Sequence, residues 1–398
     1  MTEPQDTPQG GTTGRYLVLM EDHAVEAVDA GTRQMGDVAG IRAASNADTE
    51  DAEVDFQGTE GLVLRELGIA IVNADPDQLA ALDRAAHEPG PLSLVEPERR
   101  VYAISALPAE EPLAVDESQF TWGMQAVRAQ LSQATGEGIR VAVLDTGFDV
   151  NHADFAGRSV TTSSFIQGED VQDGHGHGTH CIGTACGPRD PAEGPGYGMA
   201  YKSEIFAGKV LSNRGSGTDG GILAGIAWAI TNGCPIVSMS LGAATRPGDP
   251  YSRTYESAAN RAMAQGTLII AAAGNESRRQ NGRINPVGHP ANCPSIMAVG
   301  AVDVNMAMAW FSCGTVDEIG QVDIVGPGVD VYSSWPAPLG HNRISGTSMA
   351  TPHVAGVAAL IAQATGARAW ELWARLSQIA RRLPLPSTDV GAGLVQAP

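Results

Sequence analysis

Leu268-Ile-Ile-Ala-Ala-Ala273 indicates the fold of the larger part of the chain. The run is apolar at every position rather than at alternate positions, which is typical of a strand buried on both faces of a parallel sheet. Val141-Ala-Val-Leu144 and Ile236-Val-Ser-Met239 have the same character, and helical patterns at 221–230 and 255–265 lie between these runs. Alternating strands and helices predict an open α/β sheet, in which ligand sites lie at the carboxyl ends of the strands.

The charge balance narrows the classes of function. Among 398 residues, 25 are Lys or Arg and 45 are Asp or Glu, which gives a net charge of −20. Binding to nucleic acid or to an anionic membrane surface needs a basic patch, so this balance argues against both partners. No run of eighteen apolar residues occurs, so no membrane-spanning helix is predicted.

The N-terminal part has a different pattern. Residues 1–14 are polar and are expected to be flexible, and the acidic stretch 44–60 is expected to form a surface loop. Asp75 followed by Pro76 is typical of a helix start with Asp75 as the N-cap. Strand or helix patterns occur at 15–20, 24–35, 61–64, 69–72, 75–83, 92–95 and 101–104. Their order is roughly βαββαβ, with the strand patterns at 92–95 and 101–104 together closing the set, and it predicts a small ferredoxin-like α+β domain over residues 15–105.

The predicted linker covers residues 106–117. It contains Pro108, Pro112 and four acidic residues, a composition typical of an extended tether. The α/β domain is then expected to cover residues 118–398.

The N-terminal sequence and the cysteines bear on the compartment. Met1-Thr-Glu-Pro-Gln-Asp6 has neither the basic nor the apolar region of a signal peptide, so we expect a cytoplasmic location, with secretion as the alternative. The five cysteines are odd in number and form no C-x-x-C pair, which argues against a disulfide framework and a cysteine-based zinc site.

Three segments carry residue types with catalytic chemistry. Asp145 follows a buried strand in Val141-Ala-Val-Leu-Asp-Thr-Gly147, where a turn-forming role is the plain alternative. An aspartic protease would need a second such carboxylate, and no second Asp-Thr-Gly or Asp-Ser-Gly occurs. The second segment, residues 173–181, contains His175, His177 and His180, and favours catalysis, metal binding and a structural role equally.

The third segment is Ser345-Gly-Thr-Ser-Met-Ala-Thr-Pro-His-Val-Ala-Gly356. An apolar helix is predicted to begin directly after its small residues, which places Ser348 beside free backbone N–H groups at the positive end of that helix. This is a favourable position for a nucleophile whose reaction develops an oxyanion. A helix-capping role for the serine is the alternative.

Together, five segments resemble the subtilisin-like serine proteases, or subtilases. They are Asp145-Thr-Gly147, His177-Gly-Thr-His180, Ser240-Leu-Gly242, Ala271-Ala-Ala-Gly-Asn275 and Gly346-Thr-Ser-Met-Ala350. The similarity covers about residues 118–398, and Cys181, directly after His-Gly-Thr-His, is a feature of the proteinase K branch. The resemblance implies a monomeric serine endopeptidase with an open, mostly parallel sheet flanked by helices, which needs no cofactor for its chemistry.

The resemblance also implies a role for each catalytic residue. Ser348 is the nucleophile, His177 the general base and then acid, and Asp145 the partner that orients His177. Asn275 provides a side-chain N–H to the oxyanion, beside the backbone N–H of Ser348. A serine hydroxyl is a poor nucleophile until a neighbouring base takes its proton, and an imidazole can do so near neutral pH. His353 is expected to be buried packing.

Two further segments resemble the family's strands that pair with an extended peptide, and turn glycines are the alternative in both. They are Gly215-Ser216-Gly217 and Ser240-Leu241-Gly242. Gly288 resembles the small residue at the floor of the first specificity pocket, which is expected to be apolar. Ala243 stands where many relatives have glycine and would narrow that pocket. The expected partner is a peptide or protein substrate.

Many subtilases bind structural calcium, and two candidate sites follow from the resemblance. Asp154 matches a ligand of the family's strong site, but the usual ligand loop is replaced by residues 187–195. A site of the proteinase K type would use Asp323 with the carbonyl groups of Pro294 and Ile296. Capping or solvated acids are the alternative.

Residues 15–105 resemble the inhibitory pro-domain of the family in element order and in the ending Leu94-Val-Glu-Pro-Glu98. As a pro-domain this segment would act as an intramolecular inhibitor. The zymogen would cut its own chain between about Ser105 and Trp122. The alternative is a permanent N-terminal domain. An inert peptide-binding protein and a metallohydrolase built on the histidine cluster also remain open, and covalent labelling of Ser348 by a fluorophosphonate separates them from a serine endopeptidase.

Overall fold

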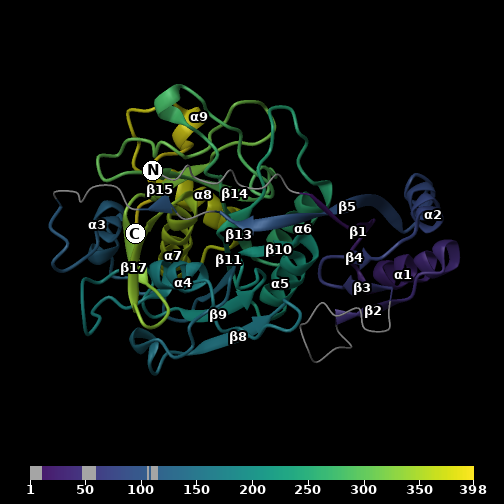
Figure 1. Cartoon of the computed structure of the whole chain (residues 1–398), viewed down its shortest axis with the longest axis horizontal. Helices are drawn as coiled ribbons and strands as arrows, with labels where there is room; N and C mark the ends of the chain where they lie inside the picture. The colour runs from purple at the N-terminus through teal and green to yellow at the C-terminus, as the bar shows by residue number, and fades with distance from the viewer. Residues whose placement is uncertain (1–10, 47–59, 105–106, 109–114) are drawn as a thin grey trace.

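The computed structural model describes residues 11–46, 60–104, 107–108 and 115–398 (Figure 1). Most of the predicted flexible N-terminus, most of the 44–60 loop and most of the 106–117 linker therefore lie outside the described residues.

The larger part of the molecule is built on a seven-stranded parallel sheet with the order β15-β14-β13-β11-β7-β9-β8. The three apolar runs that predict the sheet form β7, β11 and β13, and every residue of β11 and β13 is buried. This confirms the α/β prediction. The strands are β7 (Arg140–Asp145), β8 (Val160–Ser164), β9 (Glu204–Lys209), β11 (Ile236–Met239), β13 (Leu268–Ala272), β14 (Met297–Val302) and β15 (Ile324–Pro327).

Helices cover this sheet. α4 (His177–Cys186) and α7 (Thr347–Thr365) pack against each other and against the sheet, while α5 (Asp219–Thr231) and α6 (Arg253–Ala264) form a second pair. α7 is buried from its first residue to Ala362, because its small and apolar side chains leave no polar face. The shorter elements are α3 (Trp122–Val127), α8 (Ala369–Ile379), α9 (Ser387–Val390), η2 (Ala129–Leu131), η3 (Ala153–Phe155) and η4 (Arg279–Asn281).

The N-terminal part forms its own sheet, in which β5, β1, β4 and β3 pair antiparallel and β2 lies parallel to β3. Asp75 caps α2 as predicted, since its side chain accepts from the backbone N–H groups of Asp77 and Gln78. Residues 92–95 and 101–104 were expected to be separate strands, but residues 92–103 form one strand. The elements are β1 (Thr12–Met20), α1 (Val25–Ala39), β2 (Ala43–Ser45), β3 (Gly61–Leu64), β4 (Ile69–Val72), α2 (Pro76–Ala86) and β5 (Leu92–Ala103).

Strand β5 joins the two parts of the molecule. Its second half pairs antiparallel with β10 (Ser216–Thr218) on one side and with β12 (Leu241–Gly242) on the other. Figure 1 shows α1, α2 and the small sheet at one end of the molecule, with β5 running from them toward the larger sheet. A third sheet contains β6 (Leu107–Pro108), β16 (Val331–Ser334) and β17 (His341–Ser345).

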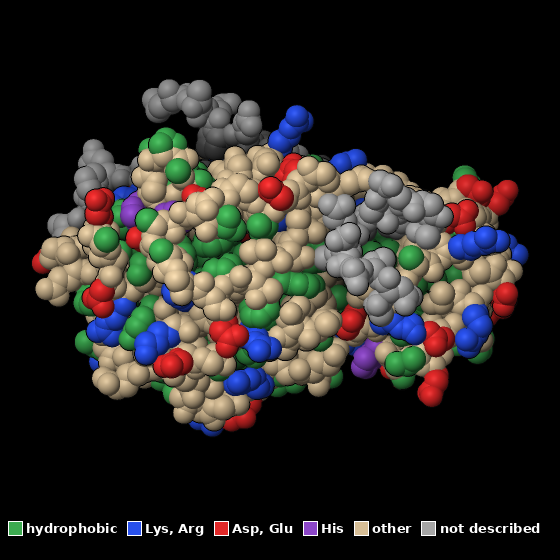
Figure 2. Space-filling view, turned by 90° about the horizontal axis from the view of Figure 1, so that it is seen from below, with side chains coloured by type: hydrophobic (Ala, Val, Ile, Leu, Met, Phe, Trp, Pro, Cys, Tyr) green, Lys and Arg blue, Asp and Glu red, His purple; other side chains and the backbone are tan. Residues whose placement is uncertain are grey.

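The surface carries charged side chains of both signs, as the composition predicts. On the face drawn in Figure 2, Lys and Arg side chains are interspersed with Asp and Glu side chains. Among the residues that the structure describes, none of the helices has the length and apolar character needed to span a lipid bilayer.

Candidate active site

Asp145 and His177 meet at the carboxyl end of the parallel sheet. Asp145 is the last residue of β7 and His177 is the first residue of α4, and both side chains are buried. His177 Nδ1 donates to Asp145 Oδ1 over 2.7 Å. A carboxylate can only accept, so the proton lies on Nδ1 and Nε2 is the free base. Nε2 has no hydrogen-bond partner among the described residues.

The neighbours of His177 set its proton affinity. Burial lowers the pKa of His177, but the contacts with Asp145 and Cys181 together outweigh burial and raise the pKa well above 6.5. The imidazole is therefore a stronger base than an isolated histidine, and it is neutral only at correspondingly higher pH.

Ser348 is the second residue of α7 and is buried. Its Oγ lies 3.1 Å from the carbonyl oxygen of Ile104 and 3.2 Å from that of Ser240. Pro352 has no N–H to donate to the Ser348 carbonyl, so this oxygen accepts instead from Ser240 Oγ over 2.8 Å. The contact fixes the nucleophile's backbone against the segment that precedes β12.

Asn275 follows β13 and faces the start of α7. Its Oδ1 accepts from the backbone N–H and from the hydroxyl of Thr347, each over 2.9 Å. Because the side-chain carbonyl is used in this way, the Nδ2 donor is directed away from Thr347. A Cβ atom on Gly346 would lie 3.0 Å from Nδ2, so the residue before Thr347 must be small.

The end of β5 lies in the groove formed by the predicted substrate segments. Tyr102 pairs with Ser216 and with Gly242, Val101 pairs with Gly217, and Ala103 pairs with Leu241. Two more backbone bonds extend the pairing, from Ala103 N–H to Gly215 O (2.8 Å) and from Ile104 N–H to Ser240 O (3.4 Å). The chain's own residues 100–104 thus adopt the conformation of an extended peptide between two strands.

Gly288 lies behind this groove. Its N–H donates to Ala273 O over 2.9 Å, and a Cβ atom at Gly288 would approach the carbonyl oxygen of Ala243 to 2.9 Å. The Ile104 side chain is only 3% exposed, and its Cδ1 lies 3.6 Å from the position of a Cβ on Gly242. The groove therefore buries an apolar side chain beside Ser348.

His180 and His353 have other surroundings. His180 Nε2 bonds to Val331 O over 3.0 Å, and burial lowers the pKa of His180 to about 3, so this ring is neutral. His353 is buried as predicted, and its Nδ1 donates to Met349 O over 2.7 Å. Cys181 Sγ lies 3.9 Å from His177 Nδ1 and donates to the Ser348 carbonyl oxygen. The described contacts of His180 do not join it to His177 as a ligand set.

Asp154 does not fit a calcium site. Its Oδ2 accepts from the Tyr197 hydroxyl over 2.6 Å and from His341 Nε2 over 2.8 Å. Its neighbours within ligand range are His152 and His341, which offer nitrogen, whereas calcium prefers oxygen ligands.

Asp323 has surroundings that do fit a cation. It lines a cavity of about 200 Å³ together with Asn292, Pro294 and Glu318, while Ile296 is not among the lining residues. Burial raises the pKa of Asp323 to about 7, and Asn292 Oδ1 has no partner among the described residues. Asp323 Oδ2 already accepts from the Ala298 N–H, and a cation in this cavity would offset the carboxylate charge and give Asn292 Oδ1 a partner.

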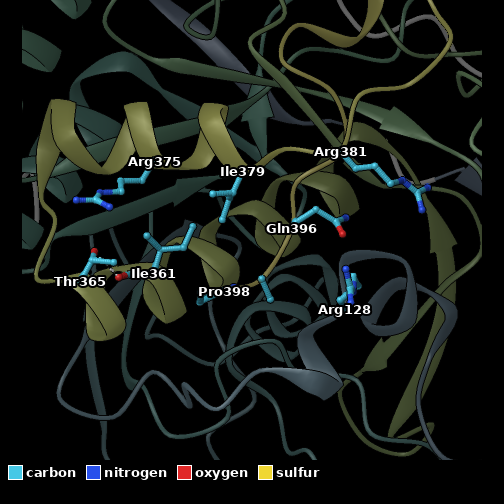
Figure 3. A pocket seen from close by; sticks show the side chains of 9 residues that line it. Arg128, Ile361, Thr365, Arg375, Ile379, Arg381, Gln396 and Pro398 are labelled. Carbon is cyan, nitrogen blue, oxygen red and sulfur yellow. Dashed lines mark hydrogen bonds between the residues drawn. The ribbon is translucent and has the colours of Figure 1, made fainter.

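A separate cavity of about 460 Å³ includes none of these residues (Figure 3). Arg128, Arg375 and Arg381 lie around it, with Ile361 among the apolar lining residues. Figure 3 shows the side chains of Arg375 and Arg381 pointing in opposite directions. The guanidinium groups therefore do not converge on a single anion.

Several residues of the site were not singled out from the sequence. Asp173 accepts hydrogen bonds around the start of α4, and Glu96 and Glu98 accept from the first turns of α6 and α5. Acidic side chains are favoured at helix N-termini, but these carboxylates lie outside their helices. Asp173 lies close to α4 in the sequence, whereas only the tertiary structure brings Glu96 and Glu98 to the ends of α6 and α5.

Comparisons with known proteins agree with this geometry. The model of the subtilase family matches residues 136–381. Alkaline elastase YaB from Bacillus sp. (strain YaB) is 36% identical over 363 residues, covering 88% of this chain and 83% of that protein. Subtilisin DY from Bacillus licheniformis is 38% identical and covers 68% of this chain and 92% of its own length. Subtilisin Savinase from Lederbergia lenta is 38% identical, with 69% and 96% covered.

The expected cytoplasmic location is wrong in the light of these relatives. The matched relatives are subtilisins and alkaline proteases, and they fit the alternative of secretion better than a cytoplasmic location. The absence of a signal-peptide pattern was a weak basis for assigning a compartment.

A family model that matches most of the chain, and relatives that align over two thirds of it or more, lead to one conclusion. This chain belongs to the subtilase family of serine endopeptidases.

Proposed function

We propose that the chain is a self-processing zymogen in which Ser348, His177 and Asp145 form the catalytic triad. One observation carries the proposal: the Ser348 hydroxyl lies 3.1 Å from the carbonyl oxygen of Ile104, at the end of a strand held as a substrate would be. The bond to be cut is then Ile104–Ser105, at the N-terminal edge of the window expected from the sequence.

The proposed reaction has two halves, formation and hydrolysis of the acyl-enzyme, and each catalytic side chain acts in both. Ser348 Oγ turns to His177 Nε2, gives up its proton and attacks the carbonyl carbon of Ile104. Asn275 Nδ2 and the Ser348 backbone N–H stabilise the oxyanion. His177 then donates its proton to the leaving amine of Ser105. Water hydrolyses the acyl-enzyme by the same route in reverse, and Asp145 stabilises the imidazolium in both halves.

Residues 15–104 are proposed to act as the intramolecular inhibitor. Their last residues, 100–104, occupy the groove, and Val101 and Ile104 are almost fully buried. The alignment with alkaline elastase YaB covers 88% of the chain, more than residues 118–398 can supply, so that relative shares part of the N-terminal region. After the cut, residues 100–104 would leave the groove only when the whole domain dissociates. Peptide substrates would then pair with residues 215–217 and 240–242.

We also propose a structural calcium ion in the Asp323 cavity. Asp323, Glu318 and Asn292 provide oxygen atoms around it, and an ion would favour the ionised form of Asp323. The ion has no part in the catalytic steps.

The test is the fate of the full-length chain. Wild-type protein should convert to fragments 1–104 and 105–398, and N-terminal sequencing of the larger fragment should begin at Ser105. The Ser348→Ala variant should stay intact with the same circular dichroism spectrum. Active wild-type protein that remains uncut would contradict self-processing, and a cut in the Ser348→Ala variant purified from a protease-deficient host would contradict the role of Ser348.

A further inference from the structure

Asp173 lies four residues before His177, and its carboxylate is buried and saturated with hydrogen bonds. Oδ1 accepts from the N–H groups of His175 (3.0 Å) and Gly176 (2.8 Å). Oδ2 accepts from the N–H and the hydroxyl of Thr179, each over 2.8 Å. The carboxylate therefore binds free N–H groups on both sides of His177, at the end of α4 where the helix has no internal acceptors.

The same carboxylate reaches the strand that carries Asp145. Thr146 Oγ1 donates to Asp173 Oδ1 over 2.9 Å and accepts from Gly178 N–H over 2.8 Å. Thr146 directly follows Asp145 and Gly178 directly follows His177, so one hydroxyl joins the neighbours of both residues. A Cβ on Gly178 would lie 2.3 Å from Gly147 O, so the two segments are in direct backbone contact here.

Lys209 supports Thr146 from the other side. It is fully buried at the end of β9, and its ammonium donates to the Thr146 carbonyl oxygen and to Asn213 Oδ1. An ion pair of 3.3 Å with Glu169 balances its charge. Both the hydroxyl and the carbonyl of Thr146 are thus held by buried charged groups.

We propose that Asp173 is a positioning residue for peptide hydrolysis, which sets the distance and orientation between His177 and Asp145 through Thr146 and the first turn of α4. The proposal rests on the proposed roles of His177 and Asp145. Asp173 touches no reacting atom. Its effect would come from holding the general base within the narrow range of geometry that proton transfer requires.

The principal variant is Asp173→Asn, which is introduced into the full-length chain and assayed after that chain has processed itself. The amide keeps the shape but presents N–H donors to a site lined entirely by donors. A misplacement of the base by about 1 Å costs about 10²-fold in rate, so kcat should fall by about 10²-fold. KM should change by less than about threefold, because the Asp173 carboxylate makes no hydrogen bond to the strands that bind substrate, β10 and β12.

The pH profile separates positioning from general destabilisation. Removing a buried negative charge close to His177 makes its protonated form less favourable, so the acid midpoint of kcat/KM should move to lower pH in Asp173→Asn. Asp149→Asn is the matched control. Asp149 is also buried, but its carboxylate accepts from Asn151, Gln172 and Ala337, none of which belongs to α4. Its kcat and midpoint should match wild type.

A second pair of variants covers the case in which Asp173→Asn does not fold. Thr146→Val removes the bridging hydroxyl and should lower kcat by at least tenfold, while Thr146→Ser keeps the hydroxyl and should retain most of kcat. Wild-type kcat in Asp173→Asn or in Thr146→Val, or a loss confined to KM, would overturn the proposal. If only this proposal fails, the wild-type enzyme would still be active and would still be labelled at Ser348 by a fluorophosphonate. If the proposed function fails, the wild-type enzyme itself would not be labelled.

Discussion

Replacing Glu96 by Ala should weaken binding of the N-terminal domain to the catalytic domain by about 30-fold. Glu96 lies on β5, and all three of its cross-domain bonds go to the start of α6. Oε2 accepts from Ser252 Oγ (2.7 Å) and Thr254 N–H (3.0 Å), and Oε1 accepts from Arg253 N–H (3.2 Å).

The magnitude follows from these contacts. A hydrogen bond to a charged group contributes about 1.5–3 kcal/mol when buried, and a carboxylate at a helix N-terminus contributes about 0.3–1 kcal/mol. Glu96 is partly exposed, so water replaces part of what is lost and the net effect is about 2 kcal/mol. At 1.4 kcal/mol per tenfold change, this is about 30-fold in the dissociation constant.

The assay is dilution of the processed, non-covalent complex, with hydrolysis of a chromogenic peptide as the readout. The concentration at which half of the full activity appears gives the dissociation constant. Glu26→Ala, an exposed acid in the first turn of α1, is the control and should match wild type. A Glu96→Ala complex that dissociates within threefold of wild type would refute the reasoning that this carboxylate holds the domain.

Three further predictions concern the catalytic domain. Asn275→Ala should lower kcat by about 10²–10³-fold with little change in KM, because the lost donor acts on the oxyanion, and a change in KM alone would contradict that role. The kcat/KM of wild type should fall on acidification with a midpoint above pH 6.5: burial lowers the pKa of His177, but Asp145 and Cys181 together outweigh burial, and the base must be neutral to act. Asp145→Asn should lower that midpoint, and an unmoved midpoint in a pH–rate series would argue against the pairing. Burial raises the pKa of Asp323 from 3.8 to about 7, so ionising it destabilises the calcium-free fold as the pH rises across that range. Calcium should then raise Tm more at about pH 8 than at about pH 5, and equal shifts in wild type and Asp323→Asn during thermal unfolding would exclude this site.

Local patterns in the sequence predicted much of the fold. The fully apolar run at 268–273 gave a buried parallel strand because a strand covered on both faces has no polar positions. Asp75 capped its helix because the acceptor and the N–H groups lie within three residues of each other. Sequence alone misjudged residues 92–103, which were expected to form two strands and form one. Glu96 and Glu98 are accommodated there because they accept from the N-termini of α6 and α5, which are distant in sequence.

In the candidate site, too, local motifs were predictable from the sequence, whereas contacts between distant segments were not. Asp145, His177, Asn275 and Ser348 stand in motifs that can be recognised without a structure. Asp173 appeared in one of those segments, but its importance comes from contacts with Thr146 and Thr179 that no spacing rule identifies. Asp154 was predicted as a calcium ligand, but its carboxylate binds Tyr197 and His341. The sequence could not show these contacts, because both residues approach from other parts of the chain.

The central claim is that Ser348 is the nucleophile activated by His177, and covalent labelling tests it most directly. Processed wild-type enzyme treated with a fluorophosphonate should gain one adduct, and peptide mass spectrometry should place the adduct on Ser348. Labelling should be absent in Ser348→Ala and strongly slowed in His177→Ala. An adduct on another residue, or peptide hydrolysis by Ser348→Ala at the wild-type rate, would contradict the account.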